Sequence, residues 1–370
     1  GWLKTADQYF YGRNNSIQHA SVKLIYDSVV DALSANPDRK FTAVEMYFFS
    51  KWFYLQTQEK KREVRRLIRN QQLQFANGGW SMHDEATAHY ADMIDQTTLG
   101  HQFLFRELGS GGGNEEDPVG DSNIRPSDGW QIDPFGHTAG QVMLFSQLAG
   151  FNTTFHSRID YQDFSHRQRT QTREFIWRPS PSLRGQAEVF ASSMLHSTYC
   201  PQYTMNFDVL LQTDSISCYD EEGKLRVDTA VDGTCSPENS ESWINRVKKL
   251  LVSDYFVTKG NDIMMTMGCD FTYMQARKWF DSMDQLIEML NSGVGDGNKG
   301  EPSLQFRAFY STPREYAASK TGSINRKYLQ KKTDDFIPYA DGPHMFWTGF
   351  YTSRPSFKRT VRKYSSFYHA

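Results

Sequence analysis

The sequence lacks several features that mark common classes of protein. Its 370 residues include only four cysteines and no Cys-x-x-Cys pair, so a zinc knuckle or a thioredoxin-like redox centre has no support. No apolar run approaches the roughly 18 residues of a membrane span, and neither a P-loop nor an HExxH motif occurs. The formal net charge of -2 gives no broad basic surface, so neither nucleic acid nor an anionic membrane is indicated as a partner.

Signals for the cellular compartment are also sparse. The opening Gly1-Trp2-Leu3-Lys4 has no basic leader or apolar segment, so no signal peptide is expected within this chain. Cys218 and Cys235 flank a polar stretch; a bridge between them would suit a secreted protein, and unpaired thiols fit equally well. Of two glycosylation sequons, Asn14 lies in a polar loop and could carry a glycan, whereas Asn152 is predicted in a strand that could not.

What the sequence does contain is an alternation of helical and strand patterns, which predicts an α/β enzyme-sized domain. The segments 109–129 and 200–241 interrupt this alternation as irregular surface excursions. Apolar and basic residues after 344 predict the start of a further helical region. Helices are predicted near 22–35, 64–68, 91–108, 138–148 and 276–290, and strands near 41–49, 73–76, 130–133, 151–155, 174–177, 263–267 and 304–310.

Asp133 is the most informative single residue. It ends a short apolar run and is followed at once by Pro134 and Gly136. Working residues of α/β proteins lie where buried parallel strands end and their loops begin. Asp133 is therefore a candidate for chemistry, and the alternative is an Asp that only caps the helix that follows.

Asp270 occupies a parallel position, at the end of the apolar run 263–267 and before a turn and a helix. Two such carboxylates suggest glycoside hydrolysis, in which a retaining enzyme places a nucleophile and an acid/base about 5 to 5.5 Å apart. The clusters 83–85 and 158–161 combine His, Asp, Glu, Arg and Tyr. They could bind sugar hydroxyls or form satisfied polar networks at the bases of loops.

The residues carry a resemblance to a known family. The chain resembles the catalytic region of glycoside hydrolase family 38, the zinc-dependent retaining α-mannosidases, and is most similar to the lysosomal type. Six ordered blocks spread over nearly the whole length carry the resemblance: GWLKT with DQY at 1–9, FANGGW at 75–80, IDPFGH at 132–137, RIDYQD at 158–163, MGCDF at 267–271, and WTG with SRP at 347–355.

This resemblance implies a fold and a set of site residues. The fold would be a seven-stranded (β/α) barrel-like catalytic domain over residues 1–342, with 343–370 beginning a three-helix bundle. Asp133 matches the nucleophile, which is also a zinc ligand, and Asp270 matches the acid/base. Trp2, Phe135 and Arg158 match residues that line the mannose-binding pocket.

The family pattern takes its other zinc ligands from a His-x-Asp motif before the opening Gly-Trp and from a histidine-containing segment beyond residue 370. Only Asp133 of the four ligands is therefore expected in this chain, which predicts a truncated catalytic region that is inactive alone. Cys269 and the 109–129 insertion differ from the pattern of close relatives.

The implied activity is hydrolysis of terminal α-linked mannose on N-glycans during glycoprotein catabolism, in a lysosome or vacuole or outside the cell. The implied partners are mannose-containing oligosaccharides, and the complete protein could form a homo-oligomer. The alternatives are a Golgi-type N-glycan-trimming mannosidase, a mannose-binding pseudoenzyme, and an inert fragment.

Overall fold

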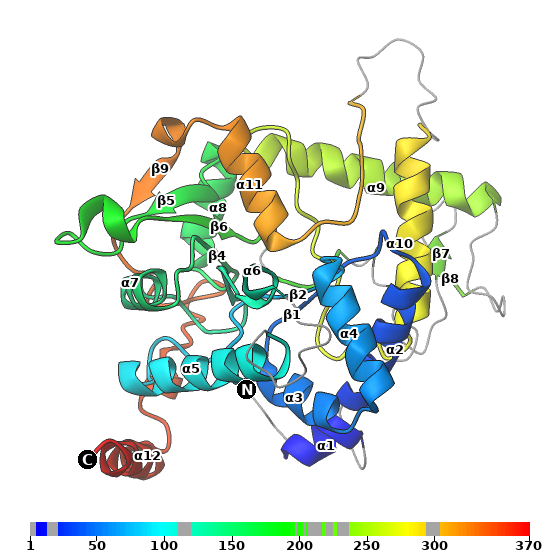
Figure 1. Cartoon of the computed structure of the whole chain (residues 1–370). Coiled ribbons are helices and arrows are strands. Elements are labelled where there is room, and N and C mark those ends of the chain that lie inside the picture. The colour runs from blue at the N-terminus through cyan, green and yellow to red at the C-terminus, as the bar shows by residue number, and fades with distance from the viewer. Residues whose placement is uncertain are drawn as a thin grey trace.

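The computed structural model describes residues 5–12, 21–109, 120–196, 198–202, 205, 207, 217–219, 225–227, 237–293 and 304–370. Strands and helices alternate along much of the chain, and the helices surround the strands (Figure 1). The fold is mixed α/β, as the alternating patterns predict.

The regular elements agree with most of the predicted segments. The strands are β1 (Phe41–Ala43), β2 (Leu73–Phe75), β3 (Asp128–Gln131), β4 (Thr153–His156), β5 (Glu174–Trp177), β6 (Val189–Ser193), β7 (Ser217–Tyr219), β8 (Leu225–Val227) and β9 (Gln330–Lys332). The α-helices are α1 (Ala6–Tyr11), α2 (Val22–Ala35), α3 (Met46–Tyr54), α4 (Gln58–Arg69), α5 (Tyr90–Glu107), α6 (Asp121–Ile124), α7 (Ala139–Leu148), α8 (Tyr161–Thr170), α9 (Pro237–Val257), α10 (Ala276–Asn291), α11 (Pro313–Ser323) and α12 (Pro355–Tyr368).

The main sheet has five strands in the order β3-β4-β6-β5-β9. Strand β4 runs parallel to both β3 and β6, and β5 runs antiparallel to β6. Strands β1 and β2 form a separate parallel pair. Among the described residues these strands do not close into a ring, so the seven-stranded barrel stays a prediction.

Asn77 joins the small sheet to the large one. Its backbone N–H donates to the carbonyl of Asp128, 2.8 Å away, while its side chain accepts from the N–H of Trp130 and donates to the carbonyl of that residue. Asn77 has a φ of 52°, which asparagine tolerates better than most side chains. The turn after β2 therefore links the small sheet to β3 without strand pairing between them.

Helices cover both faces of the main sheet. All four residues of β5 are buried. Phe175 and Trp177 pack with Val142 of α7 on one face, and Ile176 packs with Tyr316 of α11 on the other. A strand buried on both faces tends to be apolar throughout, and here Phe175, Ile176 and Trp177 are apolar while the buried Glu174 begins the strand. The largest cluster of buried side chains lies apart from this sheet, between α2, α3, α4 and α10.

The predicted strand 41–49 is wrong over its second half. Strand β1 ends at Ala43, where its pairing with β2 stops, and α3 begins at Met46. Met46, Phe49 and Phe53 are fully buried, and their spacing of three and four residues places them on one side of a helix. The helical spacing of these buried apolar residues is consistent with α3 and not with a strand.

The predicted strands 263–267 and 304–310 are also wrong, because both segments belong to no helix or strand. Their side chains nevertheless alternate as in a strand. Ile263, Met265 and Met267 pack against the largest core cluster, whereas Met264 packs against the cluster around Ile176. No strand of the described chain pairs with either segment, so the alternation exists without a hydrogen-bonded ladder.

Several other predictions have definite outcomes. Asn152 precedes β4 and is exposed, so the expectation that it is buried in a strand is wrong. Asn14, Cys235 and most of the 200–241 excursion lie outside the described residues. The predicted C-terminal helical region is present as α12, which contacts α5 where Ser365 donates to Asp92. In the described part of the chain, no helix is both long and apolar enough to cross a membrane.

The turn after β3 is held against a distant segment. Gly136 has a φ of 97°, which disfavours side chains with a Cβ. A Cβ at this position would lie 2.7 Å from the carbonyl oxygen of Phe336 and 2.9 Å from Cγ1 of Ile337. The next residue, His137, exchanges backbone hydrogen bonds with Phe336. Only glycine fits this turn, which fixes the direction of the chain just after Asp133.

We predict that Gly136→Ala lowers the free energy of unfolding by about 2 to 4 kcal/mol, from the unfavourable φ and the clash together. The matched control is Gly140→Ala in α7, where the nearest atom to an added Cβ is 3.9 Å away. The control should be neutral or stabilising by about 0.5 to 1 kcal/mol. Thermal unfolding followed by circular dichroism measures both, and equal effects would contradict the assignment of the clash.

His156 lies at the end of β4 inside a cage of aromatic rings. Its imidazole lies 5.0 Å from the ring of Phe336 and 5.0 Å from that of His137, measured between centroids. Neither ring nitrogen of His156 has a hydrogen-bond partner. Burial lowers the pKa of His156 well below its usual value, and the nearby positive groups of His137, Arg167 and Lys332 lower it further.

This depressed pKa predicts a loss of stability in acid. Below about pH 6.5 the unfolded chain takes up a proton at His156 that the folded chain does not. The free energy of unfolding should therefore fall by about 1.4 kcal/mol per pH unit for this one group. His156→Phe keeps a ring in the cage and removes the titration. Melting temperatures between about pH 7.5 and about pH 5 should fall less steeply for the variant, and parallel curves would refute the prediction.

Candidate functional site

Asp133 and Arg158 come from neighbouring parallel strands in register. Gln131 of β3 lies opposite His156 of β4, and Asp133 and Arg158 each follow by two residues. Nη2 and Nε of Arg158 both donate to Oδ1 of Asp133, at 2.6 and 3.0 Å. The sheet therefore brings the predicted nucleophile and one predicted pocket residue together at the carboxyl ends of its strands.

The Asp133–Arg158 ion pair orients the Asp133 carboxylate and adds little to the free energy of unfolding. Burial opposes the charge of Arg158, but the hydrogen bonds and the negative charge of Asp133 outweigh it and raise the pKa of the guanidinium. The side chains of Arg158 and Asp133 are 25% and 37% exposed. A half-exposed ion pair contributes little to the free energy of unfolding, so its main effect is to orient the carboxylate.

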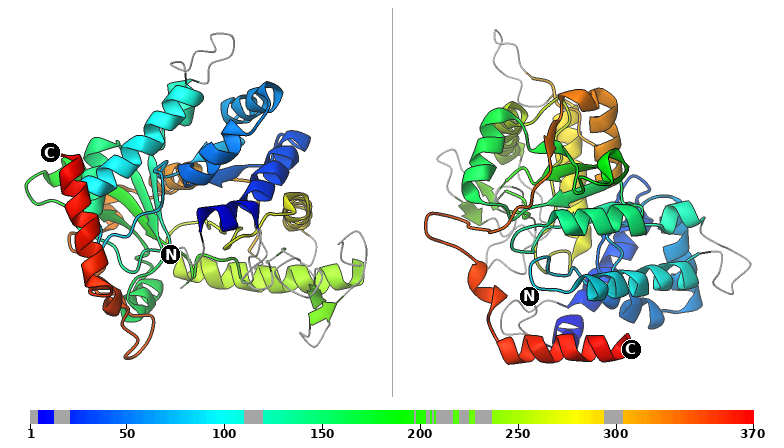
Figure 2. Two further views of the ribbon diagram at one scale, coloured as in Figure 1. Left: turned by 90° about the horizontal axis from the view of Figure 1, so that it is seen from below. Right: turned by 90° about the vertical axis from the view of Figure 1, so that its left-hand side faces the viewer.

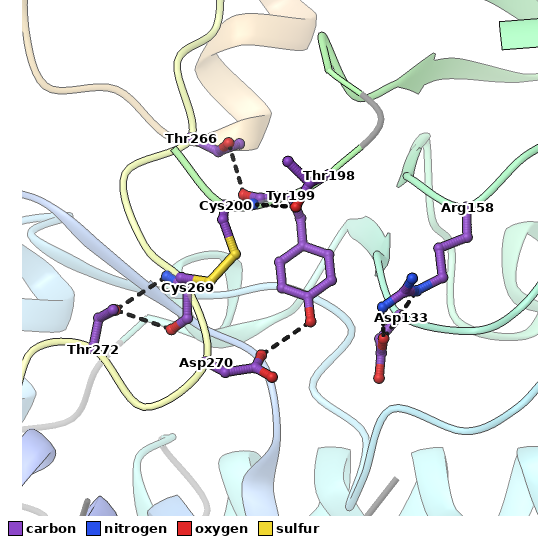
Figure 3. The surroundings of a disulfide bond; sticks show 9 residues. All are labelled: Asp133, Arg158, Thr198, Tyr199, Cys200, Thr266, Cys269, Asp270 and Thr272. Carbon is purple, nitrogen blue, oxygen red and sulfur yellow. Dashed lines mark hydrogen bonds and ion pairs between the residues drawn. A yellow bond between two sulfur atoms is a disulfide. The ribbon is translucent and has the colours of Figure 1, made fainter. Parts of the chain in front are cut away.

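Asp270 lies on the irregular segment 262–270 and contacts Tyr199. The Tyr199 hydroxyl donates to Oδ1 of Asp270 over 3.0 Å. Burial raises the pKa of Tyr199, and the charges of Asp270 and Asp133 raise it further. In Figure 3 the phenol of Tyr199 lies between Asp270 on one side and the Asp133–Arg158 pair on the other.

Tyr199 was missed by the sequence reasoning. It follows β6 in a segment with no regular structure, and no pattern in the sequence distinguishes it from the other tyrosines. It links the two carboxylates electrostatically, because the charges of both act on its hydroxyl. The guanidinium of Arg158 also lies 5.7 Å from the centre of its ring.

Phe135 forms an aromatic wall beside the two carboxylates. The guanidinium of Arg158 lies 5.1 Å from its ring centre. Its ring centroid lies 4.5 Å from that of Trp347 and 5.5 Å from that of Phe350. Aromatic faces of this kind pack against the apolar face of a sugar ring. Trp2, the other predicted aromatic of the pocket, lies outside the described residues.

A cavity of about 1190 Å³ connects these residues. Asp133, Phe135, Tyr199 and Asp270 all line it, and Arg158 supports it from behind Asp133. The volume exceeds that of most small-molecule sites, so it leaves room for more than one sugar unit. The arrangement places two carboxylates and an aromatic wall around one solvent-accessible space.

Glu45 is a third carboxyl group in the cavity wall. Burial raises its pKa, and the charge of Asp133 adds to the rise, although a hydrogen bond from the N–H of Met82 opposes it. That hydrogen bond is 2.8 Å long. The sequence reasoning did not select Glu45, because it stands between β1 and α3, where the chain was expected to continue as a strand.

The two polar clusters proposed from the sequence divide between fold and site. Glu85 is buried, lies 2.9 Å from Nδ1 of His137 and accepts from the N–H of Thr138. Asp160 caps α8 by accepting from two backbone N–H groups. These two carboxylates accept hydrogen bonds from polar groups of the fold. Asp84 lines the cavity, and Arg158 contacts the cavity-lining Asp133.

Among the described residues, one group could offer three metal ligands. Asp92 and Asp95 of α5 and His369 after α12 have ligand atoms within 4.8 Å of one another. None of the three lines the cavity. Asp133 belongs to no such group in the described part of the chain, so its surroundings do not by themselves provide the donor set of a zinc site.

Cys200 and Cys269 form a disulfide across 69 residues of sequence. This pairing was not among the predictions, which considered Cys218 and Cys235. Cys200 follows Tyr199 and Cys269 precedes Asp270, so the bond lies at the wall of the cavity (Figure 3). A structural disulfide is typical of proteins that mature in an oxidising compartment.

Comparisons with known proteins show that the chain is similar to alpha-mannosidases. The chain is 41% identical over 365 residues to a lysosomal alpha-mannosidase of Cavia porcellus, covering 98% of this chain and 33% of that protein. It is 41% identical over 374 residues to a probable alpha-mannosidase of Arabidopsis thaliana, covering 100% of this chain and 32% of that protein. The human lysosomal alpha-mannosidase is 40% identical over 365 residues.

The chain therefore spans about one third of the length of these relatives. A crystal structure of an alpha-mannosidase from Enterococcus faecalis matches the fold with a TM-score of 0.55 and 14% identity, over 85% of this chain and 28% of that one. A family model described as the N-terminal domain of glycosyl hydrolases family 38 matches residues 1–342. With this match and these identities, the chain belongs to glycosyl hydrolase family 38.

Proposed function

We propose that this chain supplies the catalytic region of a retaining α-mannosidase that removes terminal α-linked mannose from N-glycans. One observation carries the proposal: Asp133, oriented by Arg158, and Asp270, bound by Tyr199, line the same cavity. Most glycosidases use two carboxyl groups that flank the bond they hydrolyse. The alpha-mannosidase relatives supply the identity of the sugar.

In the first step, the carboxylate of Asp133 attacks the anomeric carbon of the terminal mannose. The bond from that carbon to the glycosidic oxygen breaks, and Asp270 donates a proton to the departing oxygen. The product is a mannosyl ester of Asp133. Arg158 holds Oδ1 of Asp133 at 2.6 Å, which directs the carboxylate without a rearrangement during the reaction.

In the second step, the carboxylate of Asp270 accepts a proton from water, whose oxygen attacks the anomeric carbon. The ester bond to Asp133 breaks, mannose leaves with its original configuration, and both carboxyl groups return to their starting states. The wall formed by Phe135 and Trp347 packs against the sugar ring. Trp2 is proposed to add a second stacking surface.

Zinc is part of the proposal only through the family. Asp133 is the ligand that this chain is expected to contribute, and the residues described around it do not complete a zinc site. The remaining ligands are proposed to come from sequence outside this chain, and neither step above depends on the metal.

We also propose a domain division at residue 342 and, in the complete protein, a seven-stranded barrel followed by a helical bundle. Helix α12 lies at the periphery of the molecule (Figure 2). Its Phe357, Tyr364 and Phe367 are 65%, 70% and 67% exposed. A helix with a bare apolar face normally packs against further helices, which supports a bundle beginning here.

The proposed compartment is lysosomal, vacuolar or extracellular. The Cys200–Cys269 disulfide and the relatives named as lysosomal alpha-mannosidases support it. A mannose-binding protein without turnover is the second candidate, favoured because the residues that the structure describes beside Asp133 do not complete a set of metal donors.

Asp133→Asn should lower kcat on a nitrophenyl α-mannoside by on the order of 10³-fold or more, because the amide cannot form the ester intermediate. The assay uses the longest available form of the protein at acidic pH with added zinc. Asp38→Asn, an exposed carboxylate in the turn after α2, is the control and should keep full activity. A variant at Asp133 that retains most of its kcat would exclude the nucleophile role. A wild-type protein that binds α-mannosides and hydrolyses none would favour the binding candidate.

Asp270→Asn should affect substrates according to their leaving group. A mannose disaccharide needs protonation of the departing oxygen, so kcat/KM should fall by about 10² to 10⁴-fold. A nitrophenyl mannoside has a leaving group that departs without a proton, so its first step should fall far less. Values of kcat/KM on the two substrates report the first step alone and measure the ratio, and an equal loss on both would remove Asp270 from the acid/base role.

A further inference from the structure

The Cys200–Cys269 disulfide stands between two residues of the cavity wall. Cys200 is the neighbour of Tyr199, and Cys269 is the neighbour of Asp270. In Figure 3 the sulfur bridge and the hydrogen bond between Tyr199 and Asp270 connect the same two segments. The covalent bond and the polar contact therefore act on the same pair of backbones.

Neither segment is held by regular structure. Residues 198–202 and 262–269 belong to no helix or strand. Besides the disulfide and the Tyr199–Asp270 contact, the Thr266 hydroxyl donates to the carbonyl of Tyr199 over 3.0 Å. Asp133 differs, because it extends from a paired strand. Irregular segments with few backbone hydrogen bonds open locally more easily than strands do, so Asp270 depends on other restraints.

The Cys269 side of the bridge is anchored to the protein core. The N–H of Cys269 donates to the hydroxyl of Thr272 over 3.1 Å, and that hydroxyl donates back to the carbonyl of Cys269 over 3.0 Å. Tyr273 is buried and stacks on Trp279 of α10, with centroids 4.7 Å apart. The disulfide extends this anchorage to Cys200 and hence to the backbone of Tyr199.

We propose that the Cys200–Cys269 disulfide is a positioning element that keeps the Tyr199 hydroxyl on the carboxylate of Asp270. This proposal rests on the proposed function, in which Asp270 transfers the proton. Without the bridge, the two irregular segments separate more often, and the carboxylate loses the partner that fixes its orientation. Misplacement of a proton donor by about 1 Å can cost up to about 10²-fold in rate.

The test combines Cys200→Ser and Cys269→Ser in one double variant and compares it with the wild type. Both are made in the longest available form of the protein, produced through a eukaryotic secretory pathway. Peptide mapping of the wild type without reductant should first recover the peptide that links the two cysteines. In the double variant, kcat/KM on a mannose disaccharide should fall by about ten-fold, and kcat/KM on a nitrophenyl mannoside should fall much less. Tyr199→Phe should shift the same ratio, and adding it to the double variant should change little more, because both act through one contact.

A matched control separates positioning from general destabilisation. Arg39→Lys weakens the contacts of Arg39 with Asp281 and Asp284 on α10 and leaves the bridge intact. This variant should keep the wild-type ratio of the two rates below its melting temperature. A shift equal to that of the double variant would attribute the effect to lost stability and overturn the proposal.

Hydrogen exchange gives a readout that does not need activity. In the double variant, exchange should increase at 198–202 and 262–272 and stay unchanged at β3 and β4. A missing linked peptide, unchanged exchange at both segments, or an unchanged ratio of rates in a folded double variant each overturns the positioning role. A wild type that hydrolyses neither mannoside refutes the proposed function instead, and the mapping and exchange results still decide whether the bridge orders these segments.

Discussion

The parallel pairing of β3 with β4 is the constraint on which the candidate site depends. Gln131 lies opposite His156. The register of the two strands therefore brings together Asp133 and Arg158, which follow two positions further along the chain. A shift of one residue would turn Asp133 away from Arg158 and toward the opposite face of the sheet. The aromatic cage around His156 and the glycine turn against Phe336 both resist such a shift.

The two carboxylates of the site are positioned by different means. Asp133 extends from a sheet that is covered on both faces, and an ion pair sets its orientation. Asp270 belongs to a segment without a ladder, and a disulfide, a threonine hydroxyl and a tyrosine hydroxyl restrain it. The position of Asp133, the proposed nucleophile, therefore depends on the fold as a whole, while that of Asp270, the proposed acid/base, depends on a few local contacts.

Much of the fold and part of the site follow from the sequence. The strand that ends before Asp133 and the helix that follows it were predictable. A short apolar run followed by proline and glycine is compatible with few structures other than a strand and a turn. The segments 41–49 and 263–267 show the limit. Both are apolar, and their structure depends on whether a neighbouring strand is available, which is a property of the tertiary fold.

Long-range pairings were the least predictable features. Nothing near Tyr199 or Cys200 in sequence indicates that they meet a segment 69 residues away. Four cysteines allow three connectivities if all are paired. Cys218 and Cys235 flank one polar stretch, so their spacing favours a local bridge over a distant one. Glu45 was not predicted as a site residue for a related reason, because its position in the cavity wall depends on where β1 ends.

The irregular segment that carries Asp270 has a consequence for how such a protein can diverge. A substitution within a paired strand disturbs its neighbours on both sides, so sequence change near Asp133 is expensive for folding. Residues 262–269 have no ladder to preserve, so a change at a position other than the core-packed side chains of 263–267 disturbs no strand pairing. Evolution can therefore alter the side of the cavity next to Asp270 at such positions while Asp133 stays in place, so that new ligand preferences can arise on an unchanged scaffold.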